Sequence, residues 1–317
     1  MKKLIIATRG SKLALWQSNH IKSLLESHHK GLEVELKIVI TTGDRIQDVS
    51  LSKIGGKGLF LKEIEEAMLK GEAHIAVHSL KDVPTQMPDG LLLAAIPERE
   101  DVRDALLSEK YEDIESLPKQ AVVGTSSLRR KMQILRQRPD LIIKDLRGNV
   151  DTRIRKLKEG EFDAIILASA GINRLGLSDS VKYFYPISLH EMLPAMGQGA
   201  LGIEAIESDE VLKLIECLED PLSRIETTVE RAFVDMLEGG CQVPIGVSAT
   251  VLENEKEVLI QSVLGLPNGN EILSETKLTS IDEFKTSGTQ MAERLIAKGA
   301  KELLIRAEEM ANLPQQP

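Results

Sequence analysis

Cysteine is nearly absent from this chain of 317 residues, which contains only Cys217 and Cys241. Two cysteines cannot build the disulfide framework that holds many small secreted proteins together. The sequence also contains no CxxC pair and no histidine-rich cluster, so nothing in it indicates a zinc site. We therefore expect both cysteines to be thiols kept in a reducing compartment, and we expect no bound metal.

Aromatic residues and long apolar runs are also scarce. Phe, Trp and Tyr make up 3% of the chain, so a base-stacking surface for nucleic acid is not expected. Acidic residues outnumber basic ones by 49 to 40, and the net charge of -9 disfavours general nucleic-acid binding. No apolar run has transmembrane length, and the start of the chain lacks the features of a signal peptide. We expect a cytoplasmic protein that binds neither membrane nor nucleic acid.

The first two thirds of the chain alternate between strand and helix patterns. The run LIIATR (4–9) predicts a strand, and Ser11 is a plausible cap for the helix that follows it. A helix over 58–71 is expected to end at Gly71. The pattern then restarts, with strands predicted at 121–127, 141–147 and 163–169 and helices between them. This order is typical of two α/β lobes with a cleft and a hinge.

The pattern changes near residue 220. A long helix is expected up to Gly239 and Gly240, followed by three strands, the last two joined by the turn PNGN, and then a further helix. We predict a small α+β domain with a three-stranded antiparallel sheet. The domains we predict are domain 1 at 1–97 and 198–216, domain 2 at 98–197, and domain 3 at 217–317.

Cys241 lies in the segment EGGCQVPIG, between two glycines and a proline turn. It follows the carboxyl end of the expected helix, where the helix dipole disfavours a thiolate. No histidine nearby is an obvious base. One interpretation is a small apolar residue in a turn. The other is a thiol held in open space that carries a group covalently.

A second candidate is the pair Lys81 and Asp82, which ends the strand in HIAVHSLKDVPT. Ligands bind at the carboxyl ends of strands in open α/β sheets, and a carboxylate beside a cation suits acid–base chemistry. The simpler alternative is a solvated loop pair.

Cations gather at strand-to-helix junctions of this acidic chain. Lys53 and Lys57 lie in a Gly-rich loop, and the other cations are Arg9, Arg129 and Arg130 after Ser127, Arg147, Arg153, Arg155 and Arg174. Arginine binds carboxylates and phosphates through paired N–H groups. A single such arginine is usually a surface residue, but this many predict a cleft for a ligand with several acidic groups. The loop with Lys57 does not match the P-loop pattern, so a nucleotide is not favoured.

Nine segments, in order up to residue 246, together resemble the porphobilinogen deaminase (hydroxymethylbilane synthase) family. They are ATRGSKLALWQ, TTGDRIQD, GGKGLFLKEIE, AVHSLKDVPT, GTSSLRR, DLRGNVDTRIRKL, ILASAGINRLG, LPAMGQGALGIE and RAFVDMLEGGCQVPIG. One departure is His74, where the family usually has an acidic residue. The resemblance implies two lobes similar to periplasmic binding proteins, with a third domain that presents the cysteine.

The resemblance also implies the chemistry. Cys241 would carry a dipyrromethane cofactor through a thioether, and four porphobilinogen molecules would condense head to tail with loss of ammonia to give hydroxymethylbilane for tetrapyrrole and haem biosynthesis. Asp82 would be the catalytic carboxylate. Cofactor carboxylates would be held by Lys81, Ser127, Arg129, Arg130 and Arg174. Incoming substrate would be held by Arg9, Arg147 and Arg153. Lys53 and Lys57 would lie on a loop over the cleft, and the family leads us to expect a monomer.

Two other classes of protein compete with this transferase. A bilobal anion-binding protein without chemistry would explain the two lobes, but it gives no role to Asp82 and Cys241 together. A thiol enzyme of the acyl-transfer type would need a base near Cys241.

Overall fold

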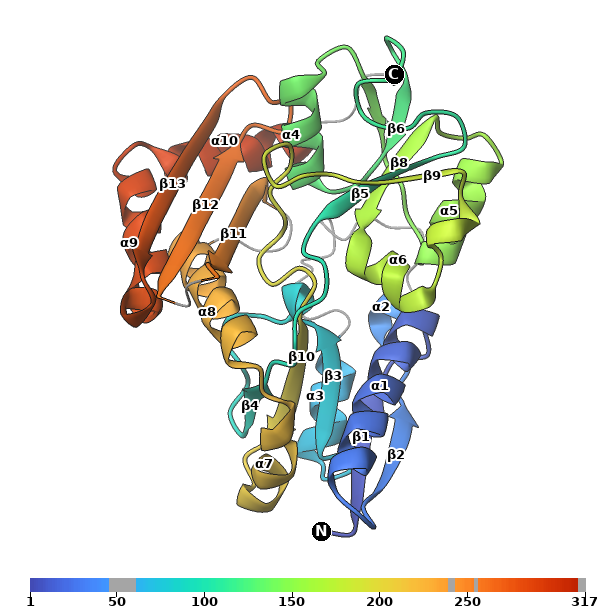
Figure 1. Ribbon diagram of the computed structural model, residues 1–317, viewed down its shortest axis with the longest axis vertical. Coiled ribbons are helices and arrows are strands. Elements are labelled where there is room, and N and C mark those ends of the chain that lie inside the picture. The colour runs from blue at the N-terminus through green and yellow to red at the C-terminus, as the bar shows by residue number, and fades with distance from the viewer. Residues whose placement is uncertain (46–60, 239–242, 254–255, 313–317) are drawn as a thin grey trace. The chain divides into compact units, whose positions relative to one another are not determined.

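In the computed structural model, whose helices and strands are labelled in Figure 1, the chain divides into two compact units. The residues that the structure describes are 1–45, 61–238, 243–253 and 256–312. Unit 1 comprises Met1–Glu100 with Gly199–Arg224, and unit 2 comprises Asp101–Gln198 with Ile225–Pro317. The division into three domains at the boundaries given above stays a prediction.

Unit 1 is built on a five-stranded mixed sheet with the order β2-β1-β3-β10-β4. The strands are β1 (Lys3–Thr8), β2 (Glu33–Ile38), β3 (Ile75–Ser79), β4 (Leu91–Ala95) and β10 (Leu201–Ile206). β1 runs parallel to β2 and β3, whereas β10 runs antiparallel to β3 and β4. The carboxyl ends of β1 and β3 therefore lie at the same edge of this sheet.

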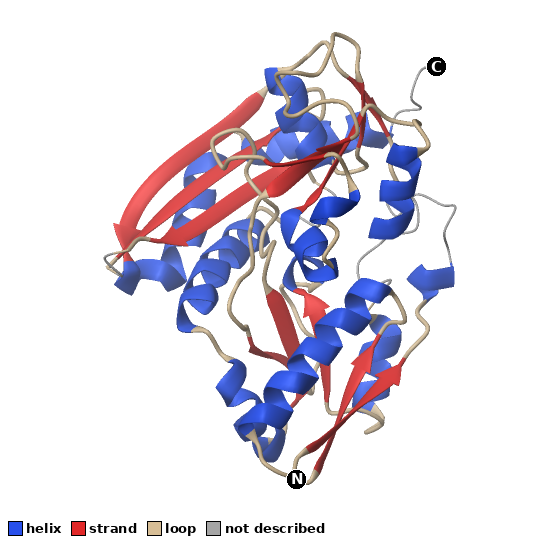
Figure 2. Cartoon of the chain, turned by 45° about the vertical axis from the view of Figure 1, so that its right-hand side comes forward, coloured by secondary structure: helices blue, strands red, loops and turns tan. Residues whose placement is uncertain are grey.

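Helices cover both faces of the sheet in unit 1 (Figure 2). The helical segments of unit 1 are α1 (Lys12–His28), α2 (Thr42–Arg45), α3 (Lys62–Leu69), the 3-10 turn η2 (Leu80–Asp82), α7 (Asp209–Ile215) and η4 (Glu216–Leu218). Ile21 of α1 belongs to one buried cluster with alternate strand residues, and Ile64 of α3 belongs to another. Two predicted helix signals are confirmed: Ser11 Oγ accepts from Ala14 N at 3.3 Å, and Gly71, with φ of 74°, follows α3.

The first sheet of unit 2 repeats this plan with the order β7-β6-β8-β5-β9. Its strands are β5 (Asp104–Ser108), β6 (Val122–Gly124), β7 (Ile142–Lys144), β8 (Ala164–Ala168) and β9 (Tyr183–Pro186). β6 is parallel to β7 and β8, and β5 is antiparallel to β8 and β9. The helices are α4 (Leu128–Gln137), α5 (Val150–Lys158), α6 (Ser169–Leu175) and η3 (Ser178–Ser180). Ile134 of α4 and Ile154 of α5 lie in separate buried clusters. Alternate residues of the strands belong to one cluster or the other, so the two clusters lie on opposite faces of the sheet.

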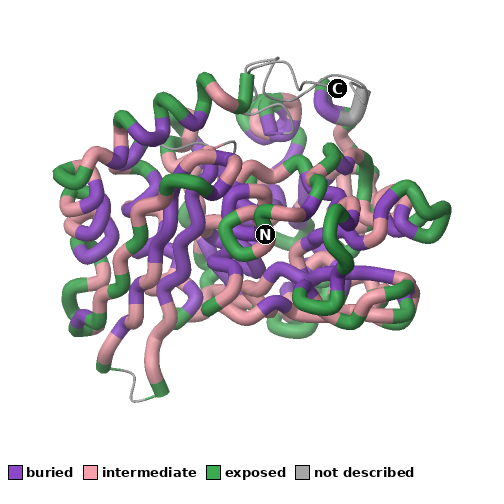
Figure 3. Tube along the Cα trace, turned by 90° about the horizontal axis from the view of Figure 1, so that it is seen from above, coloured by how far each residue is buried: buried purple, intermediate pink, exposed green. Residues whose placement is uncertain are grey.

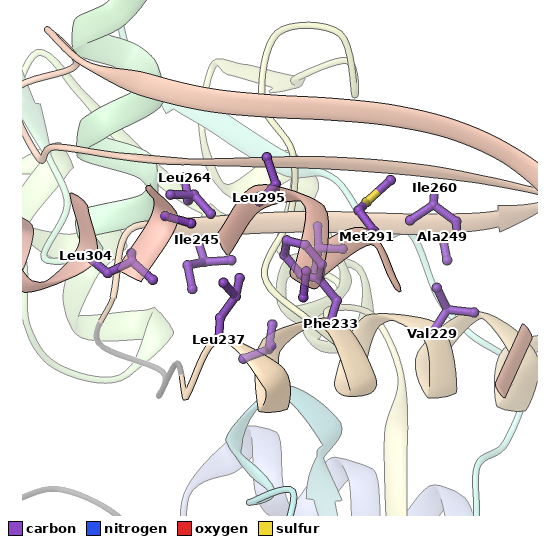
Figure 4. Packing of buried hydrophobic residues seen from close by; sticks show 14 of the residues in the cluster. Val229, Phe233, Leu237, Ile245, Ala249, Ile260, Leu264, Met291, Leu295 and Leu304 are labelled. Atoms are coloured by element: carbon purple, nitrogen blue, oxygen red, sulfur yellow. The ribbon is translucent and has the colours of Figure 1, made fainter. Parts of the chain in front are cut away.

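The C-terminal part of unit 2 is an antiparallel sheet in the order β11-β12-β13, packed against helices. Its elements are β11 (Ile245–Val251), β12 (Glu257–Gly265), β13 (Ile272–Ser280), η5 (Ile281–Glu283), α8 (Pro221–Met236, which starts in unit 1), α9 (Phe284–Ile296) and α10 (Ala300–Asn312). Figure 4 shows Phe233 of α8 and Met291 of α9 among the apolar side chains between these helices and the sheet. Figure 3 colours the buried strand segments purple.

The predicted fold class, with α/β sheets and a smaller domain of three antiparallel strands, is confirmed by these sheets. Elements that were not predicted include α2, β5, β9 and α10. No helix in the described ranges is long and apolar enough to cross a bilayer.

Candidate active site

Asp82 stands at the end of a turn whose apolar residues are buried. β3 ends at Ser79, and η2 follows it directly. Leu80 is fully buried and its N–H donates to Ala200 O at 3.0 Å, while Val83 is buried on the other side of the turn. The Asp82 side chain itself is exposed. The fold thus fixes the backbone of this turn and leaves the carboxylate open to solvent.

Gln17 is a residue of this region that the sequence reading missed. Its Nε2 donates to Ser79 Oγ at 3.0 Å, and Gln17 is 3% exposed on α1. The contact joins α1 to the last residue of β3, three positions before Asp82. A buried glutamine on a helix gives no sequence signal beyond its polarity, so its partner could not be anticipated.

Arg9 lies at the same edge of the sheet as Lys81 and Asp82. It follows β1 directly, and β1 pairs in parallel with β3 through Ala7 and Ala76. Arg9 and Lys81 are each partly exposed. Unit 1 therefore presents two cations and one carboxylate at the carboxyl ends of neighbouring strands.

In unit 2 the segment GTSSLRR forms the junction between β6 and α4. Ser127 caps α4, because its Oγ accepts from Arg130 N at 3.4 Å. Thr125 Oγ1 accepts in turn from Ser127 N at 3.1 Å. These contacts hold the first turn of the helix, which carries Arg129 and Arg130.

Both arginines are buried against Asp104, the first residue of β5. Arg129 Nη1 lies 2.5 Å from Asp104 Oδ2, and Arg130 Nη2 lies 2.8 Å from Asp104 Oδ1. Burial alone raises the pKa of Asp104, but the charges of Arg129 and Arg130 outweigh it and hold this pKa well below the usual range. Asp104 was not among the predicted site residues.

Arg147 and Arg153 lie at the next junction, between β7 and α5. Arg147 Nη2 lies 3.7 Å from Asp145 Oδ2, and Arg153 Nε donates to Gly148 O at 2.7 Å. Burial, followed by the charges of Arg130 and Arg147, lowers the pKa of Arg153 to about 10. The charges of Arg130 and Arg147 thus act on Arg153, and no carboxylate of the described residues forms an ion pair with Arg153.

The other predicted residues are less defined. Arg174 is partly exposed in the last turn of α6. Cys241, Lys53 and Lys57 lie outside the described residues. Cys217 is described. The residue is exposed in η4, and partial burial of its sulfur atom raises the pKa of the thiol.

The cationic side chains of the site favour one class of ligand. Guanidinium groups bind carboxylates through paired hydrogen bonds, and a carboxylate bound at Arg153 would offset the burial and the neighbouring charges that lower its pKa. Within the described residues no cluster of three or more His, Cys, Asp or Glu could hold a metal ion. The cations of unit 2 therefore fit an organic ligand with several carboxylates.

Comparison with known proteins covers nearly the whole chain. Residues 4–214 match the family model described as "Porphobilinogen deaminase, dipyromethane cofactor binding domain", and residues 224–297 match "Porphobilinogen deaminase, C-terminal domain".

Two curated relatives are porphobilinogen deaminases from bacteria. That of Sulfurimonas denitrificans is 72% identical over 310 residues, which is 98% of this chain and 99% of the relative. That of Campylobacter curvus is 60% identical over 313 residues, 99% of this chain and 100% of the relative. Among solved structures, a probable amino-acid ABC transporter extracellular-binding protein from Bacillus subtilis aligns with a TM-score of 0.42 and 10% identity, over 69% of this chain and 90% of that one. By its family models and these relatives, the chain belongs to the porphobilinogen deaminase family.

Proposed function

We propose that the chain joins four porphobilinogen molecules head to tail on a dipyrromethane primer bound to Cys241. Each addition releases ammonia, and water finally releases linear hydroxymethylbilane. Porphobilinogen carries an acetate and a propionate, so the growing chain is a polyanion. The observation that carries the proposal is the group of Arg130, Arg147 and Arg153. Arg153 forms no ion pair with a carboxylate of the described residues, and burial, followed by the charges of Arg130 and Arg147, lowers its pKa to about 10. Family membership and the matching cofactor-binding domain support it.

Asp82 is the residue that we assign to the chemistry. Its exposed carboxylate can give a proton to the departing amine of porphobilinogen, stabilise the resulting cation, and take the pyrrole proton after the new bond has formed. One carboxylate can serve all three purposes because the proton that it donates is recovered at the end of each addition. The buried backbone on either side of Asp82 keeps the group in one position through these steps.

The cations are assigned to carboxylates of primer and substrate. We assign Lys81, Ser127, Arg129, Arg130 and Arg174 to the primer. We assign Arg9, Arg147 and Arg153 to the incoming porphobilinogen. Arg153 stays protonated at neutral pH because its pKa of about 10 lies well above 7, and a bound carboxylate would offset the repulsion from Arg130 and Arg147.

The primer supplies the free pyrrole position to which the first porphobilinogen is added. We assign its attachment to Cys241, in the segment between Leu237, which is buried directly after α8, and Ile245, where β11 begins. From the family resemblance we also propose that the protein is a cytoplasmic monomer. Light scattering in solution tests the oligomeric state: it should give the mass of a single chain.

The products distinguish this transferase from an anion-binding protein of the same architecture. Incubation with porphobilinogen should release four molecules of ammonia for each hydroxymethylbilane formed. The purified protein should also give the colour reaction of a dipyrrole with an acidic aldehyde reagent. Binding of porphobilinogen without ammonia release and without the colour reaction would favour the anion-binding protein.

A further inference from the structure

Asp104 accepts hydrogen bonds through both of its carboxylate oxygens at the start of β5. Oδ2 accepts from Arg129 Nη1 at 2.5 Å. Oδ1 accepts from Arg130 Nε and from Gln198 Nε2, each at 3.0 Å. Asp104 has no exposed surface, and Arg129 and Arg130 are 4% and 7% exposed. A carboxylate in this position is fully committed to its protein partners.

The two arginines are held by backbone carbonyls as well. Arg129 Nη1 donates to Leu193 O at 2.7 Å, and Arg130 Nη1 donates to Ile166 O at 2.9 Å. Gln133, one turn further along α4, donates to Leu193 O and accepts from Leu193 N. The guanidinium groups of both arginines are therefore held by hydrogen bonds to β5, to β8 and to the segment before Gln198.

Charge explains why a carboxylate is needed here. Arg129 and Arg130 are consecutive in the chain, and two buried guanidinium groups so close repel each other. The repulsion contributes to a lowered pKa of Arg130, after the larger effect of burial. Asp104 cancels one of the two charges, which leaves the trio with one net positive charge.

We infer that Asp104 is a positioning residue of the anion site: it holds Arg129 and Arg130 in fixed orientations, so that they are ordered before primer carboxylates arrive. The inference rests on the proposed function, because it gives these arginines a ligand. Long arginine side chains lose conformational freedom when they bind, and prior ordering removes much of that cost. Asp104 acts through the arginines and does not itself contact primer or substrate.

A purely structural ion pair is the competing explanation. Buried ion pairs often contribute little net stability, yet removal of one partner is costly because it leaves a charge unpaired. Unfolding measurements alone cannot separate the two explanations. The separating quantity is the rate at which folded apo-protein acquires primer from porphobilinogen.

Unit 2 offers a matched control. Arg138 donates to Asp140 through Nε and Nη2, at 2.9 and 2.8 Å, and also to Ile114 O and Leu117 O. This pair is likewise an arginine and an aspartate fixed by backbone carbonyls, although Asp140 is 30% exposed. No proposed site residue takes part in it.

The experiment compares Asp104→Asn, Asp104→Glu and Asp140→Asn with the wild type. Each apo-protein is incubated with porphobilinogen, and intact mass is followed in time, with folded fraction measured by near-ultraviolet circular dichroism. We expect Asp104→Asn to acquire primer about tenfold more slowly per folded molecule, or worse, and Asp140→Asn to match the wild type. Asp104→Glu keeps the charge but displaces the carboxylate by one methylene, so we expect a slower rate there too.

Wild-type rates in folded Asp104→Asn would overturn the inference. If Asp104→Asn fails to fold, Asp104→Glu decides: a wild-type rate in that variant would overturn the positioning role. Slowing in Asp140→Asn equal to that in the Asp104 variants would also overturn it, because any lost ion pair would then have the same effect. A wild-type protein that never acquires primer would contradict the proposed function itself, and the inference with it.

Discussion

His78 Nε2 lies 2.9 Å from Glu204 Oε2, and the two side chains are 7% and 1% exposed. His78 is on β3 and Glu204 on β10, so the contact joins the two strands through their side chains. The charge of Glu204 also acts on Glu65 of α3: burial raises the pKa of Glu65, and the charge of Glu204 raises it further. The three residues before Lys81 are thus each held by a hydrogen bond. His78 contacts Glu204 of β10, Ser79 accepts from Gln17 of α1, and the Leu80 N–H donates to Ala200 O.

Replacement of Glu204 by leucine should destabilise unit 1. The His78 N–H would lose its buried acceptor, at a cost of about 1–3 kcal/mol in the free energy of unfolding. Glu204→Gln keeps an amide oxygen that can accept from His78, so it should lose less. Urea unfolding of both variants measures the difference, and a Glu204→Leu protein as stable as the wild type would disprove the role of the pair.

Asp82→Asn should remove turnover and leave folding intact. The side chain is exposed, so its loss should change stability little, whereas acid–base help is typically worth about 10²–10⁴-fold in rate. Asp82→Glu should retain part of the activity. The measurement is single-turnover kinetics on variants whose primer content is known from their mass.

Asp89→Asn is the control for that comparison, because it removes another exposed carboxylate from the same unit. It should turn over normally. Near wild-type rates in primer-loaded Asp82→Asn would move the catalytic role to another residue.

Arg153→Leu should weaken substrate binding. Loss of one charge-assisted contact to a carboxylate costs about 1.5–3 kcal/mol, which is about tenfold or more in KM. Arg155→Leu is a control on the same helix, since Arg155 Nη1 is 2.7 Å from Glu159 Oε2 in an exposed pair. Steady-state kinetics should separate them; equal KM values for the two variants would count against an anion site at Arg153.

His74 should make stability depend on pH. Its Nδ1 accepts from Ile5 N at 2.9 Å, and burial lowers its pKa from 6.5, against a smaller opposite effect of Glu210. The unfolded chain then binds the proton more readily than the folded protein. The contribution of His74 is therefore complete above about pH 6.5 and declines as the pH falls below it.

His74→Asp restores the type of residue that the family resemblance leads us to expect there. A carboxylate can accept from Ile5 N over the same pH range without titrating near 6.5. The free energy of unfolding, measured in urea between pH 5 and 8, should decline less towards pH 5 in the variant. Identical pH dependence in both proteins would exclude His74 as its cause.

Local sequence signals predicted local structure well. The cap at Ser11, the helix end before Gly71 and the antiparallel pairing around PNGN follow from short-range chemistry and are present. Pairings that depend on distant parts of the chain were not predictable. β5 lies between β8 and β9, which come much later in the sequence. The return of residues 198–216 to the first domain was predicted, but the place of β10 between β3 and β4 was not.

The candidate site was also predictable only in part: residues with a local sequence signal were predicted, and residues that depend on distant strands were not. The junction residues Arg129 and Arg130 carried a signal because cations gather at strand ends. Asp104 carried none, since an aspartate in the charged run EREDVRD reads as a solvated residue until β5 is inserted into its sheet and buries it. Gln17 was missed because a single glutamine on a helix does not indicate the partner, Ser79, that it contacts. The roles of Cys241 and Asp82 stay predictions.

The mass of the intact native protein tests the central claim most directly. We predict a mass above that of the bare sequence by two deaminated porphobilinogen units. Cys241→Ala should return the bare mass and lose activity. Cys217→Ala, which removes the exposed cysteine of η4, should keep the added mass and the activity. A fully active wild-type protein with the bare mass, or loss of the added mass in Cys217→Ala but not in Cys241→Ala, would contradict the account.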